Sequence, residues 1–298
     1  MSQVSLIPFT EHIEILRAEV DTALEQYSRF DLDCPARLSE AIRYSLLAPG
    51  KRLRPLLTLM ATEACGSARD EALPAACAVE MVHAYSLIHD DLPAMDDDDL
   101  RRGRPSCHKQ FDEATAILAG DALLARSFET LATKLQNPAI AAACCAELSH
   151  AAGASMMVGG QSDDLGEQFG DGDVNTLEAI HRRKTGAMIV VSLRMGAIVA
   201  GASGEQLEQL TTYGQKIGLA FQVVDDLLDA AGDEAALGKR VGKDADRGKL
   251  TYPGLLGVKE SRAKAEQLIA EARESIAIFG QQASHLDALA LYILERKH

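Results

Sequence analysis

Apolar residues recur at three- and four-residue spacing along most of the chain, and this period limits the folds that the chain can adopt. The segments 11–30 and 70–92 show it most clearly. Residues three and four apart share one face of an α-helix, whereas a half-buried strand needs strict alternation, of which we find no convincing run. Ala and Leu are abundant and aromatic residues make up only 4% of the chain, a composition that favours helices. We therefore predict an all-α fold.

The chain shows no Pro- or Ser-rich linker and no short repeat, so we expect a single domain over residues 1–298. Hydrophobic residues make up 47%, enough for a sizeable core. The longest apolar tract, 185–204, carries Arg194 near its middle, which favours a buried core helix over a membrane span. Two polar stretches, 162–175 and 230–250, are expected to form mobile surface loops, and the second could close over a site.

Charge and cysteine content exclude several classes of protein. The net charge of -14 argues against a nucleic-acid partner, because duplex binding depends on clusters of Lys and Arg. The six cysteines include no C-x-x-C pair, so they indicate neither a zinc knuckle nor a disulfide framework. The first residues lack a basic stretch followed by a long apolar run, which argues against a secretory signal. We expect a soluble protein in the reducing cytoplasm.

Carboxylates interrupt an otherwise apolar helical segment at 218–233. Asp225 and Asp229 lie one turn apart on the same helical face, Asp226 is adjacent, and Gln222 lies one turn earlier. Like charges at this spacing destabilise a helix, and buried carboxylates must be paired or bind a metal. Oxygen-only ligands suit Mg²⁺ or Mn²⁺ rather than zinc. The alternative is an exposed acidic stripe, but the apolar flanks favour a metal site.

A second acidic run, HDDLPAMDDDDLRRGR at residues 89–104, is followed at once by arginines. Pro93 cannot sit comfortably inside a helix, so the helix should end or distort near Leu92. The chain would then bulge, and Asp90 and Asp96 could converge on one ion. A solvated acidic loop is the alternative for this segment taken alone.

A basic segment, APGKRLRPLL at residues 48–57, forms the third feature. Gly50 leaves backbone N–H groups accessible, and Lys51, Arg52 and Arg54 crowd the start of an expected helix. Basic side chains at a helix N-terminus can bind an anion, although a plain helix start would look similar. The spacing does not match a Walker P-loop.

These three features are chemically consistent with one another. Mg²⁺ held between two facing aspartate clusters would bridge to a diphosphate. The remaining phosphate charge would be neutralised by basic side chains, namely Lys51, Arg54, Arg101 and Arg102. The aspartates and arginines of residues 89–104 would therefore serve one anionic ligand.

Several motifs together resemble those of trans-isoprenyl diphosphate synthases, most closely the bacterial farnesyl diphosphate synthases. They are GKRLRP, HDDLPAMDDDDLRRGRP, GGQSDDL, KTGAM, FQVVDDLLD and GKRVGKDADRGKLTYP, and the resemblance covers nearly the whole chain. It implies a helical bundle of the isoprenoid synthase type with a large central cavity. It also implies a homodimer that uses several Mg²⁺ ions, or Mn²⁺, to condense isopentenyl diphosphate with dimethylallyl or geranyl diphosphate.

The resemblance implies a role for each site residue. The implied metal ligands are Asp90, Asp91, Asp96, Asp225, Asp226 and Asp229. The implied isopentenyl diphosphate site comprises Gly50, Lys51, Arg54, His83 and Arg102. The implied allylic diphosphate side comprises Arg101, Lys184, Gln222, Lys239 and Lys249. Thr185 would lie beside the forming carbocation, and Gln161 and Asp164 match polar positions that line the cavity.

The length of the product should depend on Tyr85 and Ser86, which precede Asp90 by about one helical turn. A ring at Tyr85 would form a floor below the first aspartate motif and stop growth at fifteen carbons, as in the bacterial farnesyl synthases that the chain resembles. Geranylgeranyl diphosphate synthases share the two-residue insertion in that motif and remain an alternative. A class I terpene cyclase also uses helical aspartate clusters and Mg²⁺, but it would not need the GKRLRP segment.

Overall fold

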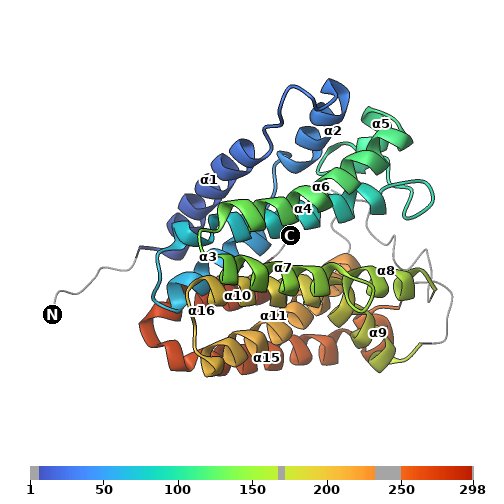
Figure 1. The fold of residues 1–298 in the computed structure, drawn as a ribbon. Helices are drawn as coiled ribbons and strands as arrows, with labels where there is room; N and C mark the ends of the chain where they lie inside the picture. Colours follow the sequence, from blue (N-terminus) through green and yellow to red (C-terminus); the bar gives the residue numbers. More distant parts are fainter. Residues whose placement is uncertain (1–6, 167–171, 232–249, 297–298) are drawn as a thin grey trace.

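The computed structural model describes residues 7–166, 172–231 and 250–296, and in these ranges the chain is helical apart from one short hairpin (Figure 1). The helices of the first half are α1 (Phe9–Tyr27), α2 (Ala36–Leu46), α3 (Leu53–Ala64), η1 (Arg69–Ala72), α4 (Leu73–Asp90), α5 (Cys107–Gln110), α6 (Glu113–Lys134) and α7 (Pro138–Ala152). Those of the second half are α8 (Met157–Gly166), α9 (Val174–His181), η2 (Arg182–Gly186), α10 (Ala187–Val199), α11 (Gly204–Ala231), α14 (Tyr252–Leu256), α15 (Val258–Ser275), η3 (Ala277–Ala283) and α16 (Ser284–Glu295). Strands β1 (Leu100–Arg101) and β2 (Arg104–Pro105) pair antiparallel. The all-α prediction is confirmed.

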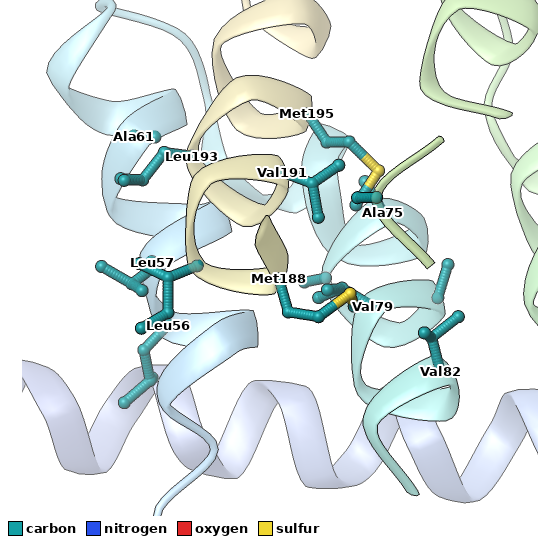
Figure 2. Packing of buried hydrophobic residues seen from close by; sticks show 14 of the residues in the cluster. Leu56, Leu57, Ala61, Ala75, Val79, Val82, Met188, Val191, Leu193 and Met195 are labelled. Atoms are coloured by element: carbon teal, nitrogen blue, oxygen red, sulfur yellow. The ribbon is translucent and has the colours of Figure 1, made fainter. Parts of the chain in front are cut away.

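Helix α10 lies between α3 and α4 in the core, as the packing of Met188, Val191 and Met195 shows (Figure 2). Its apolar tract is the one predicted to be a buried helix, and the structure confirms it. Arg194 leaves this core and forms a bidentate pair with Glu147 of α7, at 2.7 and 2.6 Å. In the described ranges, no helix combines the length and the apolar character needed to span a bilayer.

Helix α4 is buried on almost all sides, which is expected for a helix whose sequence is apolar around its whole circumference. It packs most extensively against α6, while α11 lies alongside α15 in the lower part of Figure 1. The C-terminal end of α4 carries Asp90, and α11 carries the second aspartate cluster. The core therefore fixes the position of both acidic segments.

The expectation of a surface loop at 162–175 was wrong at both ends, because residues 162–166 belong to α8 and residues 174–175 begin α9. The last turn of α8 is held by ion pairs to the neighbouring turn η2, from Asp163 to Arg183 and from Asp164 to Lys184. The second expected loop, 230–250, begins within α11, and most of it lies outside the described residues. Lys239 and Lys249 lie in that part, so their implied roles stay predictions.

Candidate active site

The loop after α4 folds back onto the end of that helix. The Asp96 amide donates to the Asp90 carbonyl at 2.8 Å, and the Asp97 amide donates to the Leu92 carbonyl at 3.1 Å. The structure therefore brings Asp90 and Asp96 together, six residues apart in sequence. Burial, with a smaller contribution from Asp96, raises the pKa of Asp90 to about 6, against the attraction of Lys184. This carboxylate is only partly compensated by cations, as expected of a metal ligand.

Asp91 lies on a different side of the helix end and is paired with Arg101. The Arg101 Nε donates to Asp91 Oδ1 at 3.0 Å, Nη2 donates to the same carboxylate, and Asp91 is 2% exposed. Burial raises the pKa of Asp91, and the guanidinium of Arg101 opposes the shift. Asp98 adds a longer contact to Arg101, at 3.6 Å. The implied metal ligand Asp91 and the implied diphosphate ligand Arg101 thus form one buried ion pair.

The hairpin β1–β2 carries Arg102 to the loop before α3. Its two turn residues, Arg102 and Gly103, both have positive φ, of 54° and 74°, as a type I′ hairpin turn requires. The Arg102 Nη1 then donates to the Ala48 carbonyl at 3.1 Å. A Cβ on Gly50 would lie 2.5 Å from that nitrogen, so this position needs glycine to admit the guanidinium.

Arg54, His83 and Arg102 form a cationic cluster between the start of α3, the middle of α4 and the hairpin. Arg54 Nε is buried and has no hydrogen-bond partner among the described residues. Burial, with repulsion from Arg102, lowers the pKa of Arg54 to about 10, although Glu80 opposes the shift. Burial and then Arg54 hold the pKa of His83 well below its ordinary value. The two guanidinium groups, beside the neutral imidazole of His83, form a suitable site for an anion. Lys51 lies at the exposed edge of this cluster.

Arg52 does not belong to that cluster, although the sequence reasoning grouped it with Lys51 and Arg54. Its guanidinium is 4% exposed and donates to Glu80 Oε1 at 2.8 Å, Asp21 Oδ1 at 2.8 Å and the Ala48 carbonyl at 3.0 Å. Glu80 is itself 2% exposed. A single acid within the apolar stretch of α4 was the sequence signal for a buried carboxylate, although it does not identify Arg52 as the partner.

Lys184 and Thr185 lie on η2, a single π-helical turn, a geometry that is frequent at functional sites. The Lys184 Nζ donates to Asp164 Oδ2 at 2.6 Å. Burial lowers the pKa of Lys184, but Asp164 and Asp90 outweigh it, so the pKa is raised overall. A Cβ on Gly160 would lie 2.5 Å from the Lys184 amide nitrogen, so glycine allows α8 to approach this turn.

Half-buried Thr185 lies beside Lys184 on this turn. On α8, both amide atoms of Gln161 are buried without a hydrogen-bond partner among the described residues. Gln161 therefore has hydrogen-bonding capacity available close to Lys184.

The second aspartate cluster lies on α11 and contacts two segments that are distant in sequence. Asp226 Oδ2 accepts a hydrogen bond from the Tyr252 amide at 2.8 Å. Asp225 Oδ1 accepts one from Arg296 Nη2 at 2.5 Å, and the Arg296 guanidinium also lies 4.0 Å from the centre of the Phe221 ring. The Arg296 side chain is only 6% exposed. No local pattern in the sequence indicates this contact, because its partners are 71 positions apart.

Gln222 and Asp229 lie half-buried on the same helix as Asp225. Among the described residues, neither set of implied aspartate ligands brings three metal-ligating atoms within 4.8 Å of one another. The two motifs lie on different helices, one at the end of α4 and one on α11. Each offers oxygen ligands only, the donor type that Mg²⁺ prefers.

Tyr85 and Ser86 lie on α4 between the cationic cluster and Asp90. Tyr85 is buried, and its ring meets His89 edge-on with centroids 5.7 Å apart. Burial, with a contribution from Asp90, raises the pKa of Tyr85 to about 12, so the phenol is neutral. The Ser86 hydroxyl donates to the His83 carbonyl at 2.9 Å.

Comparison with known proteins now identifies the family. The sequence pattern of the polyprenyl synthetase family matches residues 35–285. The chain belongs to this family. This confirms the resemblance to trans-isoprenyl diphosphate synthases, and with it prenyl transfer as the general activity of this polyprenyl synthetase.

Relatives of this polyprenyl synthetase carry different product names. Farnesyl diphosphate synthase of Escherichia coli (strain K12) is 46% identical over 292 residues, which cover 94% of this chain and 97% of the relative. Geranylgeranyl pyrophosphate synthase 7 of Arabidopsis thaliana chloroplasts is 46% identical over 295 residues, covering 97% of this chain and 84% of the relative. A crystal structure of geranyltransferase from Helicobacter pylori, complexed with magnesium and isoprenyl diphosphate, superimposes with a TM-score of 0.87 at 31% identity, covering 98% and 99% of the two chains.

Proposed function

We propose that this polyprenyl synthetase condenses isopentenyl diphosphate with dimethylallyl or geranyl diphosphate to give farnesyl diphosphate. The observation that carries the proposal is the cluster of Arg54, His83 and Arg102. His83 and Arg102 lie on the same helix and hairpin, α4 and β1–β2, that flank the carboxylates Asp90 and Asp96. The cluster suits a diphosphate bound without metal, and the carboxylates suit a diphosphate bound through metal. An enzyme that joins two diphosphate substrates needs both.

The carboxylates fit Mg²⁺ by their chemistry. Asp90 and Asp96 on one side and Asp225, Asp226 and Asp229 on the other offer oxygen atoms alone. Burial, with a smaller contribution from Asp96, raises the pKa of Asp90, and a bound divalent ion would lower it again. The Helicobacter pylori relative was solved with magnesium. We propose several Mg²⁺ ions, with Mn²⁺ as a substitute, and when bound they would stabilise diphosphate as a leaving group.

The chain's own residues would position the two substrates. Arg54, His83 and Arg102 would hold isopentenyl diphosphate, while Lys184 would contact the allylic diphosphate from η2. The Thr185 hydroxyl and the adjacent backbone dipoles would stabilise the allylic cation after the C–O bond breaks. The double bond of isopentenyl diphosphate then attacks, and the departing diphosphate takes the proton, since no described side chain at the site has the character of a dedicated base.

Water must be excluded while the cation exists, because it would quench it. Residues 230–250 remain the predicted lid. Gln222, Lys239 and Lys249 remain the further predicted contacts on the allylic side, the two lysines lying outside the described residues.

Tyr85 supports a fifteen-carbon product. Its buried ring lies on α4 about one turn before Asp90, where a tail that grows down a central cavity would meet it. The twenty-carbon product is the alternative, since relatives of equal identity carry either name. We also propose a homodimer, supported by the exposed Ile117 and Leu118 on α6.

Product analysis tests this function. The purified chain would be incubated with dimethylallyl and isopentenyl diphosphates and Mg²⁺, and the dephosphorylated products separated by gas chromatography. Farnesol as the main product is expected, and geranylgeraniol would favour the alternative. A class I terpene cyclase would instead release diphosphate from an allylic substrate when isopentenyl diphosphate is omitted, and that result would contradict the proposal.

A further inference from the structure

Two histidines and a glutamate from three helices meet at the junction of α1, α3 and α16. They are His12, Glu63 and His285, and one ligand atom from each lies within 4.8 Å of the others. The His12 Nε2 lies 2.9 Å from Glu63 Oε2, and the two imidazole rings stack with centroids 3.7 Å apart. Glu63 is nine residues beyond Arg54 on α3, roughly 14 Å along the helix axis. The cluster is thus separate from the cationic cluster and from both aspartate motifs.

His285 and Glu63 make the kind of additional hydrogen bonds that metal ligands in proteins commonly make. The His285 Nε2 lies 3.3 Å from the Ile7 carbonyl, so this nitrogen is assigned as the donor and Nδ1 as the one with a lone pair. Glu63 Oε1 accepts a hydrogen bond from Arg69 Nη1 at 3.1 Å, which directs Oε2 toward His12. Metal-binding histidines commonly donate their second N–H to a carbonyl, and ligating carboxylates are commonly hydrogen-bonded in turn.

We propose that His12, Glu63 and His285 form a binding site for a divalent transition-metal ion, Zn²⁺, that joins α1, α3 and α16. Two imidazoles and one carboxylate are a common ligand set for zinc, and water can supply the fourth ligand. Two ligands of a tetrahedral zinc ion lie roughly 3.3 Å apart, so the 2.9 Å pair of His12 and Glu63 needs to open by only a few tenths of an ångström. The proton between them leaves as the ion enters. The site takes a softer ion than the oxygen-only motifs, and its role is structural.

The test uses the untagged full-length chain with Mg²⁺ in excess, so that the aspartate motifs are occupied. Co²⁺ is added first as a spectroscopic probe, and Zn²⁺ is then titrated to displace it. We expect one equivalent of Co²⁺ with the visible absorption of four-coordinate nitrogen and oxygen ligation, displaced by one equivalent of Zn²⁺. Zn²⁺ should also raise the midpoint of thermal unfolding.

Three variants decide the assignment. His285→Gln changes a partly exposed position and should leave Mg²⁺-dependent prenyl transfer intact. Loss of a residue that only hydrogen-bonds a metal ligand weakens metal binding about 10- to 100-fold, and loss of the ligand His285 itself should weaken zinc binding by more than that. His12→Gln should do the same, with circular dichroism as the check on folding. His150→Gln, at an exposed position on α7, is the matched control and should bind zinc as the wild type does. Unchanged zinc affinity in His285→Gln would overturn the proposal, and so would a strong near-ultraviolet thiolate band, which would place the ion on cysteine.

Discussion

Arg52 and Arg54 are two positions apart, yet the same substitution should change the stability of the unliganded protein in opposite directions. Burial lowers the pKa of Arg54 from its ordinary 12.5 to about 10, a shift that corresponds to about 3 kcal/mol of unfavourable free energy for the charged form in the fold. Methionine fills a similar volume without a charge. Replacing a poorly compensated buried charge in this way is expected to raise the free energy of unfolding by about 1–3 kcal/mol.

Arg52→Met is the matched control, and it should have the opposite effect. It removes the cation that faces Glu80, a carboxylate that is only 2% exposed. Breaking one side of a buried ion pair costs about 3–5 kcal/mol, because the remaining charge stays buried without compensation. The contact to Asp21 adds less, because that carboxylate is 48% exposed.

Urea denaturation of the two variants, followed by circular dichroism, gives both free energies of unfolding. Kinetics then tests the role of Arg54. Loss of a charge-assisted hydrogen bond to a diphosphate, worth about 1.5–3 kcal/mol, should raise the KM for isopentenyl diphosphate about 10- to 100-fold, with little change for the allylic substrate. If Arg54→Met destabilises the protein as much as Arg52→Met does, Arg54 is a structural residue and the reasoning about the anion site is wrong.

Four further substitutions test other parts of the site. Burial and Arg54 hold the pKa of His83 well below 6.5, so only the unfolded chain binds a proton at this imidazole as the pH drops below 6.5. The free energy of unfolding should therefore fall by about 1.4 kcal/mol per pH unit below pH 6.5. His83→Gln should remove this part of the pH dependence, which denaturation midpoints at several pH values would measure. Asp225→Ala should lower turnover on the order of 10³-fold while the circular dichroism spectrum is kept, and wild-type turnover at saturating Mg²⁺ would exclude Asp225 as a metal ligand. Tyr85→Ala should shift products from fifteen carbons toward twenty, and Ser86→Phe toward ten. An unchanged product series in both variants would place the floor of the cavity elsewhere.

The helical period in the sequence was enough to predict α4, α10 and α11, because an apolar face is a local property that a window of residues records. The turn after α4 was also predictable, since Pro93 cannot continue a helix and the chain must fold back there. The partners within each ion pair could not be predicted from the sequence. Arg52 and Glu80 are 28 positions apart, and only the packing of α3 against α4 brings them together.

A run of like charges in the sequence suggests one functional group, but in the structure adjacent members of such a run have different partners. Residues one or two apart on a helix point in different directions, so neighbours in such a run meet different partners. Asp90 approaches Lys184 and Asp96, while the adjacent Asp91 is buried against Arg101.

The second motif divides in the same way, since Asp226 accepts from the Tyr252 amide while Asp225 faces Arg296. In each motif, therefore, one of two adjacent carboxylates is held by a hydrogen bond, from Arg101 to Asp91 and from the Tyr252 amide to Asp226. The held carboxylate fixes the backbone, and so fixes the direction of its neighbour, which lowers the entropy lost when a ligand binds there. We therefore expect one aspartate of each adjacent pair to orient its neighbour as well as to offer oxygen atoms of its own.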